Sequence, residues 1–346
     1  MKGDLRFVVP ALAGSSFIPP IGGTTNVSRR SMQYPGLRVR LVFRVRHHCS
    51  VNSIQSFSKP QSNYPMSIHR AVITAAAPDQ KSLPLQTLVD QQGQPKSALE
   101  LIIEECVDAG AEEICVIVCP GTGEIFARAA GPHANRLTFV EQNNPRGYGD
   151  ALFRAKDFVA DEPFLHLVSD HVYISHGEKS CARQAVELAE QENCVVSAVQ
   201  ETRENRLPFF GTIGGIRTGN RNDVYEVKSV IEKPTPTRAE QDLIVAGLRA
   251  SHYLCLSGIH VLTPGVMELL EEQIKNSEGN VALSNALHAS AQRERYLALR
   301  VAASRYNIGE KYGILKSQLA LALSGKDRDN ILSELLELVA NARGEA

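Results

Sequence analysis

The sequence predicts an α/β protein in which helices flank a mostly parallel β-sheet, with an antiparallel insertion in the later half. Short apolar runs alternate with helical patterns between Arg70 and Gln200, which is typical of right-handed βαβ units. After Pro208 the pattern changes to apolar strands joined by polar turns. A chain of 346 residues, 43% hydrophobic and 22% charged, has a globular composition and is long enough to bury a large core.

Five strands and three helices are predicted in the first half. The first helix begins with a capping box, in which Ser97 precedes Glu100 by three residues, and Gly110 ends it. Its apolar residues recur at helical spacing, as at Leu99 and Ile102. The strands are predicted over 71–77, 114–119, 137–142, 164–170 and 194–200, and the other helices over 148–159 and 177–191.

The second half predicts antiparallel strands and a closing helix. The runs 210–217 and 224–231 are apolar and are joined by the polar turn 219–223. A further strand is expected over 253–262, a helix with Pro264 in its first turn, and a last strand over 296–306. A leucine-rich pattern at helical spacing predicts a C-terminal helix within 326–346: Leu332, Leu335, Leu336 and Val339.

The first 65 residues differ from the rest of the chain in charge. They carry nine Lys or Arg residues and one acid, a net charge of +8, which leaves −9 for the remainder. Because the segment lacks helical periodicity, we expect a disordered basic N-terminal extension over 1–65, although 37–45 alternates enough for a stray strand. Its composition is typical of organelle transit peptides, whereas a start codon assigned too early would place the true beginning near Met66, and we favour the second interpretation.

Composition also excludes several classes of protein. The remainder of the chain is acidic and so lacks the positive charge with which proteins bind nucleic acid. No apolar stretch approaches the length of a membrane span. The seven cysteines form no Cys-x-x-Cys pair and no zinc-type cluster, and most lie in apolar runs as small hydrophobes. These features predict a cytoplasmic protein.

Asp170 is the first candidate for chemistry. The apolar run that begins at Phe164 predicts a buried parallel strand, and Asp170 stands at its carboxyl end. Open α/β sheets bind ligands beyond these strand ends. A carboxylate there suits a hard divalent cation that carries a nucleotide phosphate, although strand-end Asp residues also cap turns.

Other patterns surround this strand. The loop after the first strand reads Ala75-Ala-Ala-Pro-Asp-Gln-Lys81. Gln142 stands five residues before the turn Gly147-Tyr-Gly149, whose glycines let the backbone approach a ligand closely. An amide side chain can donate to and accept from a pyrimidine edge.

In their order, these patterns and those of the later strands resemble the bacterial UTP-glucose-1-phosphate uridylyltransferases within the sugar-1-phosphate nucleotidyltransferase family. The resemblance covers Arg70 to about Leu323. It implies a Rossmann-like nucleotidyltransferase domain over 66–325, which binds the triphosphate at its first strands and the sugar phosphate over its later ones. It also implies nucleotide contacts by a set of five residues: Ala75, Ala76, Gln142, Gly147 and Gly149.

The resemblance further implies magnesium chemistry at Asp170. Asn307 stands where the family has a second acid, and a neutral oxygen would hold Mg²⁺ more weakly. Lys81 stands where the family has an Arg and would contact phosphate, but the glycines of the family loop are absent. The segment 279–285 has also lost the acids that the family carries near the metal.

On the sugar side, the resemblance assigns residues from three later strands. Phe210-Gly211 matches an aromatic-Gly segment beside the sugar, and Gly258 stands in a strand under it. Glu232 would accept hydrogen bonds from sugar hydroxyls, and Lys233 would contact phosphates, so that Lys81, Asp170 and Lys233 form the predicted catalytic set.

The expected reaction converts UTP and glucose 1-phosphate to UDP-glucose and pyrophosphate. A catalytically impaired homologue that senses nucleotide or nucleotide sugar is the alternative, because of the altered loop and Asn307. A dehydrogenase is disfavoured, since no Gly-x-Gly-x-x-Gly follows the first strand. The leucine-rich helix leaves a homo-oligomer open.

Overall fold

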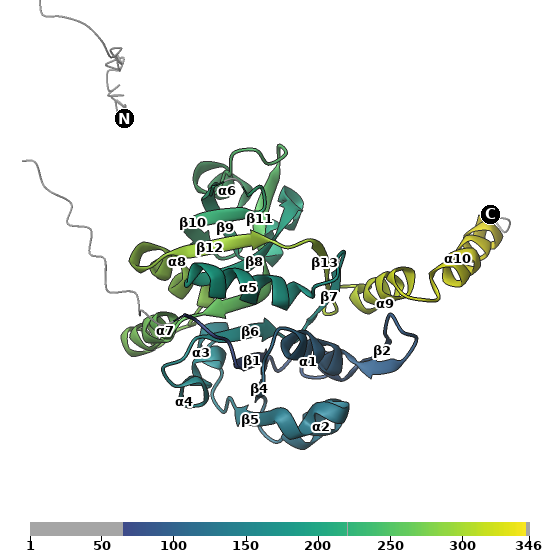
Figure 1. The fold of residues 1–346 in the computed structure, drawn as a ribbon, viewed down its shortest axis with the longest axis horizontal. Coiled ribbons are helices and arrows are strands. Elements are labelled where there is room, and N and C mark those ends of the chain that lie inside the picture. Colours follow the sequence, from purple (N-terminus) through teal and green to yellow (C-terminus); the bar gives the residue numbers. More distant parts are fainter. Residues whose placement is uncertain (1–64, 220, 344–346) are drawn as a thin grey trace, which may run out of the picture. The chain divides into compact units, whose positions relative to one another are not determined.

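The computed structural model describes residues 65–219 and 221–343. The extension predicted over 1–65 therefore lies outside the described residues, apart from Pro65. A nine-stranded sheet occupies the centre of the described chain (Figure 1). Its strands follow the order β5, β4, β1, β6, β11, β8, β12, β10, β9. Their bounds are Leu137–Glu141, Glu113–Val118, Arg70–Ala75, Phe164–Val168, His252–Leu262, Val195–Arg203, Tyr296–Arg300, Val224–Ile231 and Thr212–Arg217.

The sheet is mixed, and the predicted fold class is confirmed. The strands β5, β4, β1 and β6 are parallel neighbours, as are β8 and β12. The strand β11 is antiparallel to both β6 and β8, and β10 is antiparallel to both β12 and β9. The antiparallel pair predicted over 210–231 is thus present, and the carboxyl ends of β1, β4 and β6 meet at one sheet edge.

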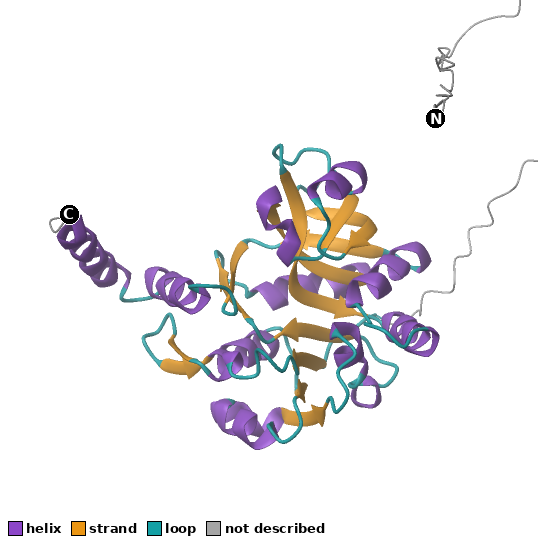
Figure 2. Ribbon diagram, turned by 180° about the vertical axis from the view of Figure 1, so that it is seen from behind, coloured by secondary structure: helices purple, strands orange, loops and turns teal. Residues whose placement is uncertain are grey.

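Helices cover both faces of the sheet (Figure 2). One core joins the sheet to α1, α2 and α5, through buried residues such as Ile103, Phe126 and Val186. The opposite core joins it to α3, α4, α7 and α8, through residues such as Leu152 and Leu270. These helices span Ala98–Asp108, Gly123–Ala129 and Cys181–Glu192 on the first face, and Tyr148–Phe153, Lys156–Val159, Pro264–Asn276 and Leu283–Arg293 on the second.

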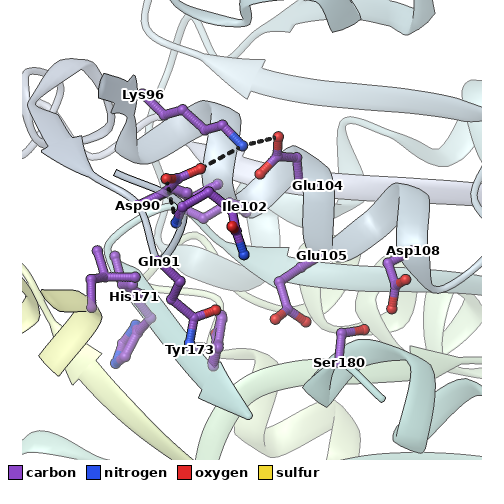
Figure 3. A pocket seen from close by; sticks show the side chains of 14 residues that line it. Asp90, Gln91, Lys96, Ile102, Glu104, Glu105, Asp108, His171, Tyr173 and Ser180 are labelled. Atoms are coloured by element: carbon purple, nitrogen blue, oxygen red, sulfur yellow. Dashed lines mark hydrogen bonds and ion pairs between the residues drawn. The ribbon is translucent and has the colours of Figure 1, made fainter. Parts of the chain in front are cut away.

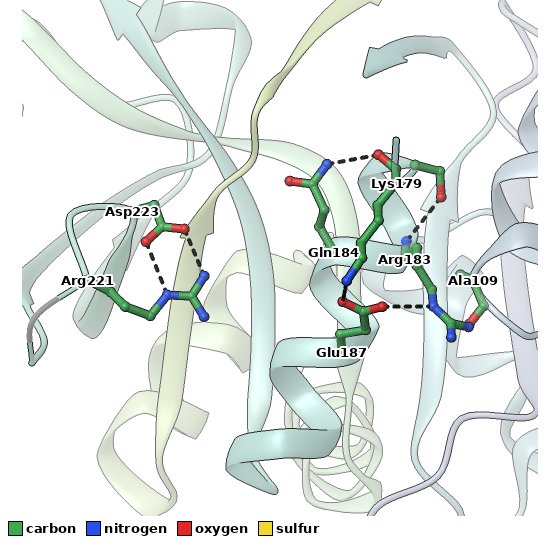
Figure 4. Close-up of polar contacts among 8 residues, drawn as sticks. Ala109, Lys179, Arg183, Gln184, Glu187, Arg221 and Asp223 are labelled. Carbon is green, nitrogen blue, oxygen red and sulfur yellow. Dashed lines mark hydrogen bonds and ion pairs between the residues drawn. The ribbon is translucent and has the colours of Figure 1, made fainter. Parts of the chain in front are cut away.

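Two helices on the first face are fixed by local polar contacts. The predicted cap of α1 is confirmed, because the Ser97 hydroxyl accepts a hydrogen bond from Glu100 N. On α5, Glu187 binds both Lys179 and Arg183, at 2.6 and 3.2 Å (Figure 4). Arg183 also donates to Ala109 O at the end of α1, at 3.4 Å, which ties the two helices together.

Smaller elements complete the described part of the chain. The strand β7 (His171–Ser175) pairs with β13 (Ala303–Asn307) in an antiparallel ribbon, and β2 (Thr87–Val89) pairs with β3 (Pro95–Ser97). The helix α9 (Gly313–Ser324) packs Leu321 against this ribbon. The helices α6 (Pro236–Asp242) and α10 (Arg328–Arg343) and three short 3₁₀ turns (Leu83–Leu85, Gly131–Arg136 and Glu204–Phe209) account for the rest.

Three predicted elements differ from the structure. The helix expected over 148–159 is two short helices, and α4 ends where Ala160 adopts a φ of 52°. The strand expected over 296–306 is β12 and β13, because the chain leaves the main sheet to pair with β7. The helix expected from Gly177 begins at Cys181, after Ser180 caps it. Among the residues that the structure describes, none of the helices combines the length and apolar character that crossing a membrane requires.

Candidate functional site

The strand ends predicted to bind the nucleotide lie side by side. Ala75 and Ala76 are buried at the end of β1, between the ends of β4 and β6. Ser169 N donates to Thr74 O at 3.2 Å, and the Cys119 thiol donates to Ala76 O at 3.4 Å. The chain turns sharply after β6, so Asp170 lies at this same sheet edge.

Asp170 is held in its ionised form. Its Oδ1 accepts a hydrogen bond from His171 Nδ1 at 2.7 Å. Burial alone would raise the pKa of Asp170, but the charge and hydrogen bond of His171 and the charge of Arg305 outweigh it, and the pKa falls below 3.8. A carboxylate that is ionised at neutral pH, at the ends of parallel strands, is suited to a bound cation.

The ribbon of β7 and β13 brings Asn307 to Asp170. Asn307 is paired with His171 in the ribbon, and Ile308 N donates to Asp170 O at 2.9 Å. Asn307 Oδ1 accepts from Gly309 N at 2.7 Å, which fixes the turn that follows. The two residues that the sequence assigned to the metal are therefore neighbours, although 137 positions separate them.

The first phosphate loop packs against this turn. A Cβ built on Gly309 would lie 3.0 Å from Leu83 Cδ1 and 3.4 Å from Gln80 Nε2, so the loop and the Asn307 turn are in close contact. Lys81 is exposed in this loop. Its neighbours Gln80 and Leu83 are the loop residues that lie against Gly309.

The donor set fits Mg²⁺ if the substrates complete the coordination. Asp170 offers one carboxylate and Asn307 one amide oxygen, and Mg²⁺ often takes its other ligands from water and substrate phosphates. Within residues 65–219 and 221–343, no three His, Cys, Asp or Glu side chains gather in a way that could hold a metal ion.

The Gly147 turn is braced from a distant segment. Val281 N donates to Arg146 O at 2.7 Å, and Gly149 N donates to Val281 O at 2.8 Å. Gly147 has φ 105° and ψ −178°, a conformation that only glycine adopts without strain. The segment 279–285, which lacks the family's acids, thus supports the backbone of the turn.

Gln142 lies beside this turn, but its amide hydrogens are used inside the protein. Its Nε2 donates to Asp150 at 2.6 Å and to Gly147 O at 3.4 Å, and the side chain is only 5% exposed. Asp150 is fully buried and also binds Arg154 at 2.6 Å. Only the amide oxygen of Gln142 is left for a contact with a base.

The sugar-side residues converge from three strands. A Cβ on Gly211 would lie 3.2 Å from a carboxylate oxygen of Glu232, so Glu232 lies against this glycine. Gly258, with φ 81°, faces the end of β6, and a Cβ there would lie 2.5 Å from Val168 Cγ2. Lys233, which follows Glu232 in the sequence, has a φ of 44°, and its backbone amide donates to Phe210 O at 3.2 Å.

Tyr148 connects the nucleotide and sugar sides, and the sequence did not single it out. Its hydroxyl lies 2.6 Å from His166 Nε2, while its ring is 37% exposed. Burial raises the pKa of the Tyr148 hydroxyl, and the carboxylates of Asp170 and Glu232 raise it further. The charges of both carboxylates thus disfavour ionisation of this hydroxyl, which stays protonated. The position of Tyr148 between two candidate glycines was the available signal.

His166 holds this hydroxyl in place. It is fully buried, and burial lowers the pKa of its imidazole to about 4, so the ring is neutral. Because His166 Nδ1 lies 2.9 Å from Val72 O, which can only accept, Nδ1 carries the proton and Nε2 accepts from Tyr148. Two strands and the Gly147 turn are thereby linked through side chains.

An acidic cavity of about 280 Å³ lies behind the ribbon (Figure 3). Its lining includes Glu105, Asp108 and the Asp90–Lys96–Glu104 group, in which Lys96 binds both acids at 3.0 and 2.6 Å. Burial, with the nearby charge of Asp108, raises the pKa of Glu105 to about 7, while the amide of Ala182 opposes the rise. These contacts tie α1 to α5 and to the β2–β3 hairpin.

A family of known proteins and several individual proteins are similar to this chain in sequence. The chain matches the family described as nucleotidyl transferase over residues 87–315. It is 25% identical over 299 residues to a UTP-glucose-1-phosphate uridylyltransferase of Streptococcus pneumoniae, covering 78% of this chain and 96% of that protein. It is also 25% identical over 283 residues to uridylyltransferase 1 of Streptococcus pyogenes, covering 74% and 89%.

Solved structures share the fold. A UDP-glucose pyrophosphorylase complexed with UDP-glucose superposes with a TM-score of 0.61 at 22% identity, over 73% of this chain and 98% of that one. A UTP-bound enzyme of Acinetobacter baumannii gives 0.60 at 20% identity, over 79% and 100%. The family match extends over well over half of the sequence, and the chain therefore belongs to the nucleotidyl transferase family.

Proposed function

We propose that this protein transfers a uridylyl group from UTP to glucose 1-phosphate and releases pyrophosphate. The observation that carries the proposal is the close packing of Gly258 on the end of β6, where a Cβ would lie 2.5 Å from Val168 Cγ2, two residues before Asp170 and at the edge where β1, β4 and β6 end. This edge is where open α/β sheets bind ligands. The similarity to uridylyltransferases supports this substrate pair.

In the proposed reaction an oxygen of the sugar phosphate attacks the α-phosphorus of the nucleotide. The new P–O bond forms in line as the bond from the α-phosphorus to the bridging oxygen breaks, and pyrophosphate leaves with the electron pair. Such transfers depend mainly on positioning and charge neutralisation. A bound Mg²⁺, held by Asp170 and Asn307, would neutralise phosphate charge.

Residues of the first strands and of the Gly147 turn would contact the nucleotide. The strand end at Ala75 and Ala76 would lie against the nucleotide, and Gly147 and Gly149 would admit its base and ribose. Gln142 would accept a hydrogen bond from the base through its amide oxygen.

Charged and sugar-side residues complete the proposed site. Lys81 and Lys233 would contact the phosphates as point charges. Glu232 would accept hydrogen bonds from sugar hydroxyls, with Gly211 and Gly258 leaving space for the ring.

A screen of substrate pairs tests this proposal. Pyrophosphate release is measured for each nucleoside triphosphate with each of several sugar 1-phosphates, with Mg²⁺ and with excess EDTA. We expect the highest rate with UTP and glucose 1-phosphate, and loss of that rate in EDTA. Binding of UTP without turnover for any pair would instead support the sensor, which the absence of glycines in the first loop and the neutral Asn307 favour.

We further propose a cytoplasmic location and a homo-oligomeric state. The six cysteines within the described residues are all unpaired, as a reducing compartment would keep them. The helix α10 exposes Leu332, Leu336, Leu338 and Val339, which a second copy could cover. Light scattering of the purified protein measures the oligomeric state.

A further inference from the structure

A second cavity, of about 410 Å³, opens beside Asn307. It lies among the end of β8, the turn Glu204–Phe209, the strand β13 and the start of α9. Four cations line it: Arg203, Arg206, Arg305 and Lys316. Asn307 and Phe210 also line this cavity, so it shares two residues with the proposed site, whereas Lys81, Lys233 and Asp170 are not part of its lining.

The acids of this cavity form an ion pair with only one of its four cations. Glu310 forms an ion pair with Arg206, and Glu201 is paired at 3.3 Å with Arg300, which lies outside the cavity. None of the ion pairs in the described part of the chain includes Arg203, Arg305 or Lys316. Three positive charges therefore line one concave space without forming an ion pair among the described residues, although the carboxylates of Asp170 and Glu310 lie near enough to Arg305 to influence it. Such a cleft concentrates a positive potential.

Arg305 is the least expected of these charges, because it is only partly exposed. Its guanidinium lies 3.8 Å from the centre of the Phe210 ring and donates to Leu256 O. Burial lowers the pKa of Arg305, and Tyr173, Cys255, Asp170 and Glu310 oppose this shift, although none of them forms an ion pair with Arg305. Charged groups withdrawn from water are normally paired. An Arg whose guanidinium lies over a ring and forms no ion pair keeps N–H donors that a ligand can use.

We propose that this cavity, the Arg305 cavity, binds an oxyanion of a small molecule, a phosphate or carboxylate group, through Arg203, Arg305 and Lys316. The planar guanidinium of Arg305 suits two oxygens of such a group, and Arg203 and Lys316 add charge from the exposed rim. The oxyanion has two sources with the same chemistry. It belongs either to the sugar substrate, as an acidic group besides its 1-phosphate, or to a separate small molecule.

Direct binding tests the Arg305 cavity without using turnover. Inorganic phosphate is titrated into the full-length protein by calorimetry at low ionic strength, with wild type, Lys316→Gln, Arg203→Gln and the control Lys275→Gln. Lys275 is an exposed cation of α7 outside the cavity, so its variant loses the same charge. We expect Lys316→Gln and Arg203→Gln each to weaken phosphate binding by about tenfold, the effect of one lost charge-assisted hydrogen bond, and the control to change it by less than about twofold.

Both rim residues are exposed, so their variants should fold, and their melting temperatures verify this. If phosphate binds only at Lys81 or Lys233, neither Lys316→Gln nor Arg203→Gln changes its affinity. Equal phosphate affinities in all four proteins would therefore overturn the proposal. Because the readout is binding, an inactive enzyme with intact phosphate binding would refute the proposed reaction and leave this inference standing.

Two further titrations identify the source. If the oxyanion belongs to the sugar, glucuronic acid 1-phosphate binds about tenfold more tightly than glucose 1-phosphate, and Lys316→Gln removes the difference. If it belongs to a separate molecule, inorganic phosphate binds with the same affinity in the presence of saturating glucose 1-phosphate. A wild-type protein that shows neither the preference nor simultaneous binding would contradict the proposal.

Discussion

Replacement of Gly147 by Ala tests whether the braced turn forms the nucleotide side of the site. A methyl group there would overlap Asn280 Oδ1 and lie 2.8 Å from Val281 O. The backbone at φ 105° would also be strained, at a cost of about 1–3 kcal/mol. The hydrogen bonds Val281 N to Arg146 O and Gly149 N to Val281 O would be lost if the segments separate, at about 1 kcal/mol each.

The combined cost is therefore about 3–5 kcal/mol. If the turn stays docked, both hydrogen bonds remain, and the strain alone lowers the free energy of unfolding by about 1–3 kcal/mol in a urea titration. If the turn separates locally, the protein stays folded and the Kd for UTP, measured by calorimetry, rises by about 100-fold or more.

The matched control is Gly177→Ala. A methyl group at Gly177 meets no atom within 4 Å, so neither stability nor UTP affinity should change appreciably. The reasoning fails if Gly147→Ala leaves both quantities as they are in the control.

Three other substitutions test separate parts of the account. Glu105→Gln should remove a pH dependence: the raised pKa means that protonated Glu105 contributes stability that is complete below pH 4.5 and is lost as the pH rises through about 7. In urea titrations, the free energy of unfolding of the variant minus that of wild type should rise by about 3 kcal/mol between pH 4 and 8. A difference that does not change with pH would refute the raised pKa. Asn307→Asp adds a second carboxylate and should lower the half-saturating Mg²⁺ concentration for pyrophosphate release by about fivefold or more; an unchanged value would remove Asn307 from the metal site. Lys233→Ala should reduce turnover by about tenfold or more through the loss of a phosphate contact, whereas Arg217→Ala should not, and equal rates would exclude Lys233 from the site.

The sequence was sufficient to predict the fold class and the position of Asp170. The buried run from Phe164 and the helix cap at Ser97 are local signals, and the structure has both within two residues of the predicted positions. Strand alternation also predicted βαβ units, and β5, β4, β1 and β6 are indeed parallel neighbours. Periodicity could not reveal that β7 follows β6 after two residues, because its pattern continues the same apolar run.

The rest of the site depends on contacts between distant segments. Gln142 is occupied by Asp150, whose complete burial results from tertiary packing and has no sequence signal. Asn280 and Val281 brace the Gly147 turn from more than 130 positions away. Arg305 stands two residues before Asn307, but its lack of an ion pair is visible only once every acid around it has been placed.

The most direct test of the central claim is Asp170→Asn, which keeps the shape of the side chain and removes its charge. Initial rates of pyrophosphate release from UTP and glucose 1-phosphate are measured at saturating Mg²⁺, with thermal unfolding recorded for the same samples. If Asp170 gathers the cation and both phosphates in one crevice, the rate falls by about 100-fold or more while the melting temperature changes by only a few degrees. A folded variant with the wild-type rate would contradict the account.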